Sequence, residues 1–245
     1  MNYILDAHTH TIVSGHAFNT IDEMVQEAKN KGLKLLGITE HASDMPGSCH
    51  PYYFSNLPCI KKYYNKNELI VLFGCEGNII EENGIYTLDI LRDNFTSQCV
   101  DYIIASMHKC CFPPKNKNEN TKAFLDVMNT GRVNILGHID DGNFELDYEE
   151  IIKCAKKNKV VIELNNSSNS PIGFRINAHN LDLIYLELCK KYNVPIVLNS
   201  DAHCRYDILN FEYILPILKE VNFPDELILN TSTDKFIKYA INKEW

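Results

Sequence analysis

The sequence predicts an α/β protein whose parallel sheet forms a single α/β barrel. Short apolar runs alternate with helical stretches of about ten residues, which is the pattern of successive βα units. The length of 245 residues is typical of one such barrel. No repeat, low-complexity tract or linker interrupts the alternation, so we expect residues 1–245 to form one domain.

Seven apolar segments are the predicted strands. They occupy residues 3–5, 33–39, 69–74, 102–106, 133–137, 160–164 and 194–198. Because helical stretches separate most of them, the strands should run parallel.

The best-defined helix is the first. Thr20-Ile21-Asp22-Glu23 has the form of a capping box, and Gly32 ends the helix after Lys31. Further helices are predicted at 59–65, 122–128, 148–157 and 181–191, and the remainder is mostly helical to about residue 241. Two polar stretches, 43–58 with its aromatic segment 52–57 and 113–121, are predicted to be loops on the active face.

The composition indicates a folded protein with 45% hydrophobic and 23% charged residues. No apolar run approaches the roughly 20 residues of a membrane helix, and no basic segment precedes an apolar core at the N-terminus. We therefore expect a cytoplasmic protein. The net charge of −8 disfavours nucleic-acid binding, which needs a basic surface, but it permits an anionic small molecule held by metals.

The nine cysteines are predicted to be reduced thiols. None has Cys-x-x-Cys spacing, and Cys75, Cys99, Cys154 and Cys189 lie inside apolar stretches. The pair Cys110-Cys111 differs because it follows a histidine at a strand end, so it either contacts a site or fills a loop.

Asp6, His8 and His10 alternate at the end of the first predicted strand and should share one face. Two imidazoles so placed can bind one divalent metal, with Asp6 orienting them. Two surface histidines are the alternative, and the remaining histidines decide between these interpretations.

Seven of the nine histidines fall at or just beyond the end of a predicted strand. In an α/β barrel, the carboxyl ends of the strands converge on the face that carries catalysis. Two acidic residues occupy similar positions. The predicted metal ligands are therefore His8, His10, His16, His41, Glu76, His108, His138, Asp201 and His203.

Nine ligands exceed the four that one zinc ion typically takes, so we expect two or three ions with Glu76 as a bridge. The mixture of imidazoles and carboxylates suits Zn²⁺, Mn²⁺ or Fe²⁺ and is too rich in imidazole for Mg²⁺ or Ca²⁺. Three such ions leave a positive pocket, which favours a phosphate monoester attacked by a bridging hydroxide. The sequence contains no Cys-x5-Arg loop, no suitable Asp-x-Asp pair and no Gly-x-Ser-x-Gly elbow, in agreement with metal-activated water.

Three further residues are candidate substrate contacts. His50, in the aromatic loop, either reaches the pocket as a contact or proton donor or is solvated. Arg175 and Lys109 can pair with phosphate, although a solvated surface charge is the more common state of both. The amides and hydroxyls of residues 163–168 can orient substrate or hydrogen-bond a metal-bound histidine, or the segment is a turn rich in Asn and Ser. His179, at a predicted helix start, is expected to be structural.

Together the motifs resemble the PHP (polymerase and histidinol phosphatase) family, most closely its YcdX-like phosphatase branch. The matching segments follow the family's order at 6–11 (DAHTHT), 37–41 (GITEH), 74–78 (GCEGN), 106–108 (SMH), 136–138 (LGH), 163–168 (ELNNSS) and 199–203 (NSDAH). The resemblance implies a distorted (β/α)7 TIM-like barrel with a trinuclear metal cleft, usually containing zinc, at the C-terminal strand ends. It assigns His8, His10, Glu76 and Asp201 to one ion, Glu76, His108 and His138 to another, and His16, His41 and His203 to the third.

Two positions depart from the family pattern. Glu40 stands where the family has aspartate, which we expect to be tolerated with an effect on how His41 is oriented. Ile139-Asp140-Asp141 stands where this branch often has His-Pro, which affects the expected substrate contacts.

The sequence-based hypothesis is a metal-dependent hydrolase of small phosphate monoesters, with Glu76, Asp201 and His203 as catalytic residues. Phosphodiester cleavage, including 3′–5′ exonuclease activity, is an alternative that the acidic composition disfavours. A metal hydrolase of the amidohydrolase type is a second alternative. That class commonly has a metal-bridging lysine at mid-barrel, where this chain offers Glu76, which favours the PHP family. A metal-binding regulatory protein on the same fold is the non-enzymatic alternative. The sequence leaves open the physiological substrate, the metal, the general acid and the oligomeric state, a homo-oligomer included.

Overall fold

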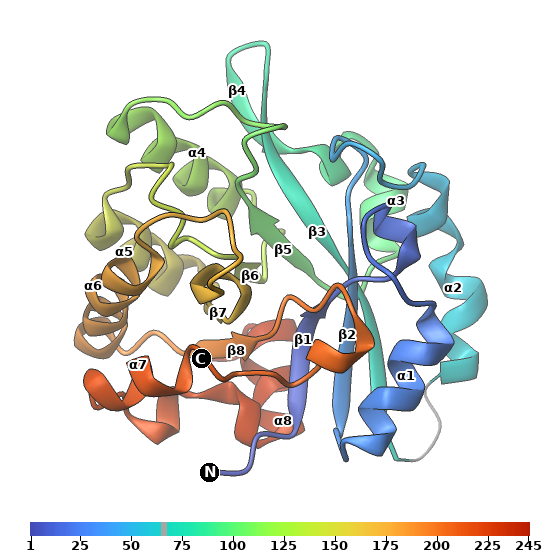
Figure 1. The fold of residues 1–245 in the computed structure, drawn as a ribbon. Helices are drawn as coiled ribbons and strands as arrows, with labels where there is room; N and C mark the ends of the chain where they lie inside the picture. The colour runs from blue at the N-terminus through green and yellow to red at the C-terminus, as the bar shows by residue number, and fades with distance from the viewer. Residues whose placement is uncertain (65–67) are drawn as a thin grey trace.

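The sheet is an α/β barrel of parallel strands, as predicted (Figure 1). The computed structural model describes residues 1–64 and 68–245. The strands pair in the order β1-β2-β3-β5-β6-β7-β8, and β4 pairs antiparallel with the extended end of β3. Their bounds are β1 (Leu5–Thr9), β2 (Leu35–His41), β3 (Ile70–Glu82), β4 (Ile85–Leu88), β5 (Ile103–Ser106), β6 (Ile135–Leu136), β7 (Val161–Asn165) and β8 (Ile196–Asn199).

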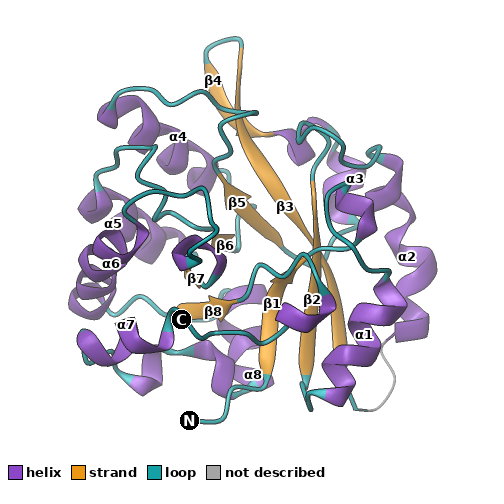
Figure 2. Ribbon diagram, viewed as in Figure 1, coloured by secondary structure: helices purple, strands orange, loops and turns teal. Residues whose placement is uncertain are grey.

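Helices surround the strands (Figure 2). They are α1 (Ile21–Asn30), α2 (Tyr52–Tyr64), α3 (Asn94–Gln98), α4 (Lys117–Asn129), α5 (Tyr148–Asn158), α6 (Ala178–Tyr192), α7 (Leu215–Glu220) and α8 (Thr233–Phe236), which continues into a π-helical turn, Ile237–Ile241. The predicted capping box is present at α1, where Thr20 and Glu23 each accept the backbone N–H of the other. Within the described residues, no helix has the length and apolarity needed to cross a membrane.

Two predicted loops proved partly helical. Residues 52–57 belong to α2, which begins seven residues before the predicted helix 59–65, and the predicted end at residue 65 lies outside the described residues. Proline within a sequence usually ends a helix, but α2 continues through Pro58 because Phe54 and Leu57 are buried against the core. Residues 117–121 of the other predicted loop form the start of α4.

The third strand is longer than predicted because its second half pairs with β4, a strand that the sequence analysis missed. Glu76 therefore lies within β3 rather than after it, and His8 likewise lies within β1. The hairpin of β3 and β4 projects at the top of the view in Figure 1.

The C-terminal segment closes the barrel at the end where the strands begin (Figure 1). Phe236 and Ala240 are fully buried and pack in one cluster with interior side chains such as Leu5, Tyr102 and Ile104. The larger apolar core lies around the strands and includes residues of the surrounding helices. These two layers leave only the opposite end of the barrel open for a site.

Strands β1 and β8 meet without a continuous ladder of backbone hydrogen bonds, and a side chain joins them. One backbone bridge pairs Thr9 with Ala202. The buried Asn230 side chain accepts the N–H of Leu198 at 2.7 Å and donates to the carbonyl oxygens of Leu198 (2.7 Å) and Leu5 (3.0 Å). Asn230 therefore satisfies buried backbone groups on both strands at this seam.

Replacing Asn230 by alanine should lower the free energy of unfolding by about 3 kcal/mol. The change leaves three buried backbone contacts unmade, and each unsatisfied group costs about 1–3 kcal/mol. Urea titration of the variant measures the loss, with the exposed Asn180→Ala as a control that should stay within about 0.5 kcal/mol of the parent. A loss below about 1 kcal/mol for Asn230→Ala would show that the seam does not depend on this side chain.

Candidate metal centre

The structure brings the nine predicted ligands together at the C-terminal ends of the strands. Most of them are buried, while His203 is partly exposed and His16 is exposed at the rim. The chain positions them from strands and from the loops that directly follow strands. The backbone of the barrel therefore sets the positions of the nine ligand side chains.

Four ligand atoms form the deepest group. His8 Nε2 lies 3.3 Å from Glu76 Oε2 and 3.6 Å from Asp201 Oδ1. His10 Nε2 lies 3.4 and 3.3 Å from the same two oxygens. All four atoms are buried, and none of them has a hydrogen-bond partner among the described residues. A tetrahedral ion with bonds of about 2.1 Å has ligand–ligand edges of about 3.4 Å, so these residues fit a divalent metal such as zinc.

Glu76 also faces a second group through its other oxygen. Its Oε1 lies 2.8 Å from His138 Nε2 and 3.3 Å from His108 Nε2, while its Oε2 lies 2.7 Å from His41 Nδ1. Burial opposes the ionisation of this carboxyl, but the surrounding histidines hold its pKa well below the usual range. Glu76 is therefore an ionised carboxylate placed between two groups of imidazoles.

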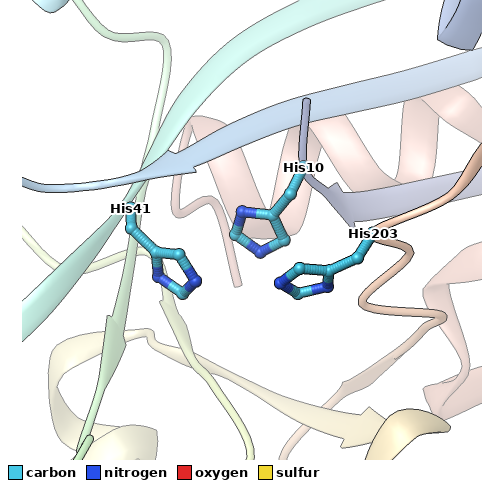
Figure 3. A group of neighbouring side chains, drawn as sticks. All are labelled: His10, His41 and His203. Atoms are coloured by element: carbon cyan, nitrogen blue, oxygen red, sulfur yellow. The ribbon is translucent and has the colours of Figure 1, made fainter. Parts of the chain in front are cut away.

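A third group lies nearer the rim. Figure 3 shows His10, His41 and His203 pointing toward one another, and their ligand atoms lie within 4.8 Å. His203 Nε2 is 3.0 Å from His16 Nε2. The Nδ1–H of His203 donates to the carbonyl oxygen of Asp201, so the Nε2 atom is left with a lone pair. Two imidazole nitrogens this close need a cation or a proton between them.

Hydrogen bonds set the orientation of His8 and His108. His8 Nδ1 lies 2.7 Å from Glu163 Oε1, and His108 Nδ1 lies 2.8 Å from Asn78 Oδ1. Since both partners are acceptors, each Nδ1 donates and each Nε2 keeps its lone pair for a metal. Burial lowers the pKa of His108 to about 4, which keeps that ring neutral. A hydrogen bond from segment 163–168 to a candidate ligand was one of the predicted interpretations, but the group that makes it is the Glu163 carboxylate and not an amide or hydroxyl.

Glu40 orients the next histidine through a serine. The Ser14 hydroxyl donates to Glu40 Oε2 at 2.6 Å, so it must accept from His10 Nδ1 at 3.0 Å. The same hydroxyl accepts the backbone N–H of His41 at 3.1 Å. Glu40 therefore influences both His10 and His41, whereas the departure from the family pattern at this position predicted an effect on His41 alone.

Among the described residues, no hydrogen bond joins the Asp6 carboxylate to a histidine ring; His8 contacts it through its backbone N–H alone, so the prediction that Asp6 orients the imidazoles was wrong. Its carboxylate accepts the backbone N–H groups of Ser200 and Leu209 and the Ser200 hydroxyl, and it thereby holds the loop that carries Asp201. The register of β1 shifts after Asp6, so strict alternation along this strand does not apply.

The Arg175 side chain is only 6% exposed, so it is not the solvated surface charge that is the more common state. Its Nη2 lies 3.2 Å from Asp201 Oδ2, and its Nη1 donates to Asn165 Oδ1 at 3.3 Å and Ser168 Oγ at 3.1 Å. Asp201 is thus held on one oxygen by Arg175 and keeps the other for a metal. The sequence could not show this contact because it joins a loop to a strand end 26 residues away.

Of the other candidate residues, Lys109 lies beside the metal centre, whereas His50 and His179 do not line its cavity. Lys109 is exposed and lines the open cavity, whereas His50 is exposed beside Tyr52 and is not among the residues that line that cavity. His179 is exposed and pairs with Glu220 at 3.3 Å, away from the ligands. The nine cysteines, all within the described residues, are free, and Cys110 lines the cavity with its sulfur 3.7 Å from that of Cys111.

Two of the predicted ligands have a left-handed backbone. His138 has a φ of 29° and Asp201 has a φ of 56°. Residues other than glycine rarely adopt this backbone region. The N–H of His138 donates to Glu163 Oε2 at 2.8 Å, and Asp6 and Arg175 hold the segment around Asp201. Backbone strain of this kind persists where surrounding contacts fix it, as at functional sites.

Comparison with known proteins agrees with this geometry. The model of the PHP domain family matches residues 6–167. A probable phosphatase of Clostridium botulinum strain Hall is 42% identical over 243 residues, covering 99% of this chain and 96% of the relative. A probable phosphatase of Clostridium acetobutylicum is 39% identical over 240 residues, covering 98% and 95%.

The fold also matches solved structures. Histidinol phosphate phosphatase from Lactococcus lactis, determined with zinc, L-histidinol and phosphate, superposes with a TM-score of 0.62 at 19% identity, covering 91% of this chain and 95% of that one. At this identity the superposition shows the shared fold alone. The sequence matches extend over nearly the full length of the relatives, and this chain therefore belongs to the PHP domain family.

Proposed function

We propose that the protein is a metal-dependent phosphoesterase that hydrolyses small phosphate monoesters at a trinuclear site. The observation that carries this proposal is the convergence of four buried ligand atoms, from His8, His10, Glu76 and Asp201, that have no hydrogen-bond partner in the described part of the chain. Each such atom costs about 1–3 kcal/mol when it stays unpaired, so the group is built to bind cations. The phosphatase names of the relatives support the reaction class.

Three sets of residues would hold the ions. His8, His10, Glu76 and Asp201 would hold the first, Glu76 with His108 and His138 the second, and His16, His41 and His203 the third. Zinc suits this mixture of nitrogen and oxygen donors, and Mn²⁺ or Fe²⁺ also fits. When bound, the ions would activate water as a nucleophile at neutral pH and neutralise charge on the phosphoryl oxygens.

The residues of the chain contribute positioning and charge. Glu76 joins the first two sets, Asp201 is held by Arg175, and His203 presents its Nε2 at the rim. Lys109 lines the cavity and is the side chain we assign to the phosphate of the substrate. Arg175 pairs with Asp201 and also lines the cavity. A contact with the substrate phosphate would therefore be a second function of the same guanidinium.

Separate variants distinguish these two cations. Lys109→Gln should raise KM for a monoester about tenfold with metal content unchanged, because a charge-assisted hydrogen bond contributes about 1.5–3 kcal/mol. Arg175→Lys should lower the bound metal per chain, since lysine cannot reproduce the guanidinium contacts with Asp201, Asn165 and Ser168. Steady-state kinetics and elemental analysis measure both effects, with the exposed Lys157→Gln as the control. Unchanged metal in Arg175→Lys together with a raised KM would assign Arg175 to the substrate alone.

Metal content tests the proposed function directly. Protein purified without chelator should contain two to three equivalents of zinc, manganese or iron, and the His8→Ala variant should contain less. The loaded protein should hydrolyse p-nitrophenyl phosphate much faster than bis-p-nitrophenyl phosphate, which separates a monoesterase from a diesterase. One equivalent or none, not restored by added metal, would contradict the multinuclear site. Hydrolysis of no monoester across a broad panel would contradict the reaction.

A further inference from the structure

The cavity above the metal centre is larger than a phosphate group needs. Its volume is about 750 Å³, within the range of pockets that enclose drug-sized molecules. The proposed ligands His41, His108, Asp201 and His203 line one part of it. The remaining walls are therefore available to bind the organic group of a substrate.

A loop between β7 and α6 gives this cavity an apolar wall. Ile172 is 96% exposed and Phe174 is 74% exposed, and both line the cavity. The loop is held in place because Gly173 donates its N–H to the carbonyl of Ser170 and Arg175 pairs with Asp201. Met45 and Met107 add thioether side chains to the lining. An apolar ligand group would remove this exposed surface from water, which is favourable.

The charges on the walls disfavour a second anionic group. Lys109 and Arg175 are the cations among the described residues that line the cavity, and Arg175 is already paired with Asp201. Asp141 and Asp207 also line the cavity and would repel an additional negative charge. Lys109, and any contact that Arg175 makes besides Asp201, serve the one phosphate. No further lysine or arginine among the described lining residues is then available for a carboxylate or a second phosphate.

We infer, on the basis of the proposed phosphatase function, that the substrates are phosphate monoesters of apolar, aromatic alcohols without a second anionic group. Phe174 and Ile172 determine this specificity by covering the aromatic ring, while the metal centre binds the phosphate. The contact is made with the part of the substrate that does not react, so its loss should appear in KM more than in kcat.

Three alcohol monoesters test this inference on the metal-loaded protein. Benzyl phosphate carries an aromatic ring, glycerol 3-phosphate lacks one, and 4-carboxybenzyl phosphate adds a negative charge to the ring. We expect kcat/KM for benzyl phosphate to exceed that for each of the others on the order of tenfold or more, given the contribution of burying an aromatic group. Phe174→Ala should reduce the preference over glycerol 3-phosphate to about threefold or less, mainly through KM.

A matched control is available in Phe95→Ala. Phe95 is 64% exposed on α3 and does not line the cavity, so this change should leave the preference unaltered. Equal kcat/KM for benzyl and glycerol phosphates, or a preference that Phe174→Ala does not change, would overturn the inference while leaving the phosphatase proposal intact. Failure to hydrolyse any of the three by a protein that hydrolyses p-nitrophenyl phosphate would also overturn the inference alone, whereas failure on the whole monoester panel would overturn both.

Discussion

Replacing Glu76 by glutamine should lower kcat/KM for a phosphate monoester at least about 1000-fold and remove at least one metal ion per chain. Glu76 presents Oε2 to the group around His8 and His10 and Oε1 to His138. An amide keeps the shape but loses the charge that balances the cations and replaces one acceptor with a donor. A loss of about 4 kcal/mol of transition-state stabilisation corresponds to this factor.

The measurement combines kinetics with elemental analysis and circular dichroism. The matched control is Glu187→Gln, an exposed glutamate on α6 that pairs only with Lys190 among the described residues, and it should keep full activity and metal. A Glu76→Gln protein with a full complement of metal and less than tenfold loss of activity would show that Glu76 does not bridge the ions.

Replacing Glu163 by glutamine should weaken metal binding about 10- to 100-fold. Glu163 accepts from His8 Nδ1 at 2.7 Å and from the backbone N–H of His138 at 2.8 Å. Burial opposes the ionisation of this carboxyl, but His8 and His138 together outweigh it and lower the pKa of Glu163 below its usual value. Glu163 is therefore ionised. Glutamine must turn its NH₂ group toward one of the two donors, and partners that orient metal ligands typically have effects of this size.

Competition with a chelator of known affinity measures this change. Glu150→Gln alters an exposed glutamate at the start of α5 and is the control, which should bind metal like the parent. Unchanged affinity in Glu163→Gln would mean that strand geometry alone orients His8. A variant with normal affinity but lower activity would likewise contradict an effect through the metal.

The sequence was sufficient to predict the barrel and its seven parallel strands. Apolar runs such as 160–164 and 194–198 can only be buried in a sheet covered by the helices between them, and β7 and β8 lie at nearly those residues. It was insufficient for α2, where an aromatic segment and Pro58 suggested a loop, and for β4, whose formation depends on the projecting half of β3.

The sequence by itself determined which residues meet at the candidate metal centre. Parallel strands bring their carboxyl ends to one edge whatever the detailed packing, so His8, His41 and His138 converge once the barrel forms. Only the tertiary structure decided what holds them. Glu163 reaches His8 across 155 residues, Asp201 pairs with Arg175, and the Asp6 carboxylate binds Ser200 instead of a histidine ring. These contacts depend on side-chain directions and loop paths between distant segments, and strand periodicity contains no information about either.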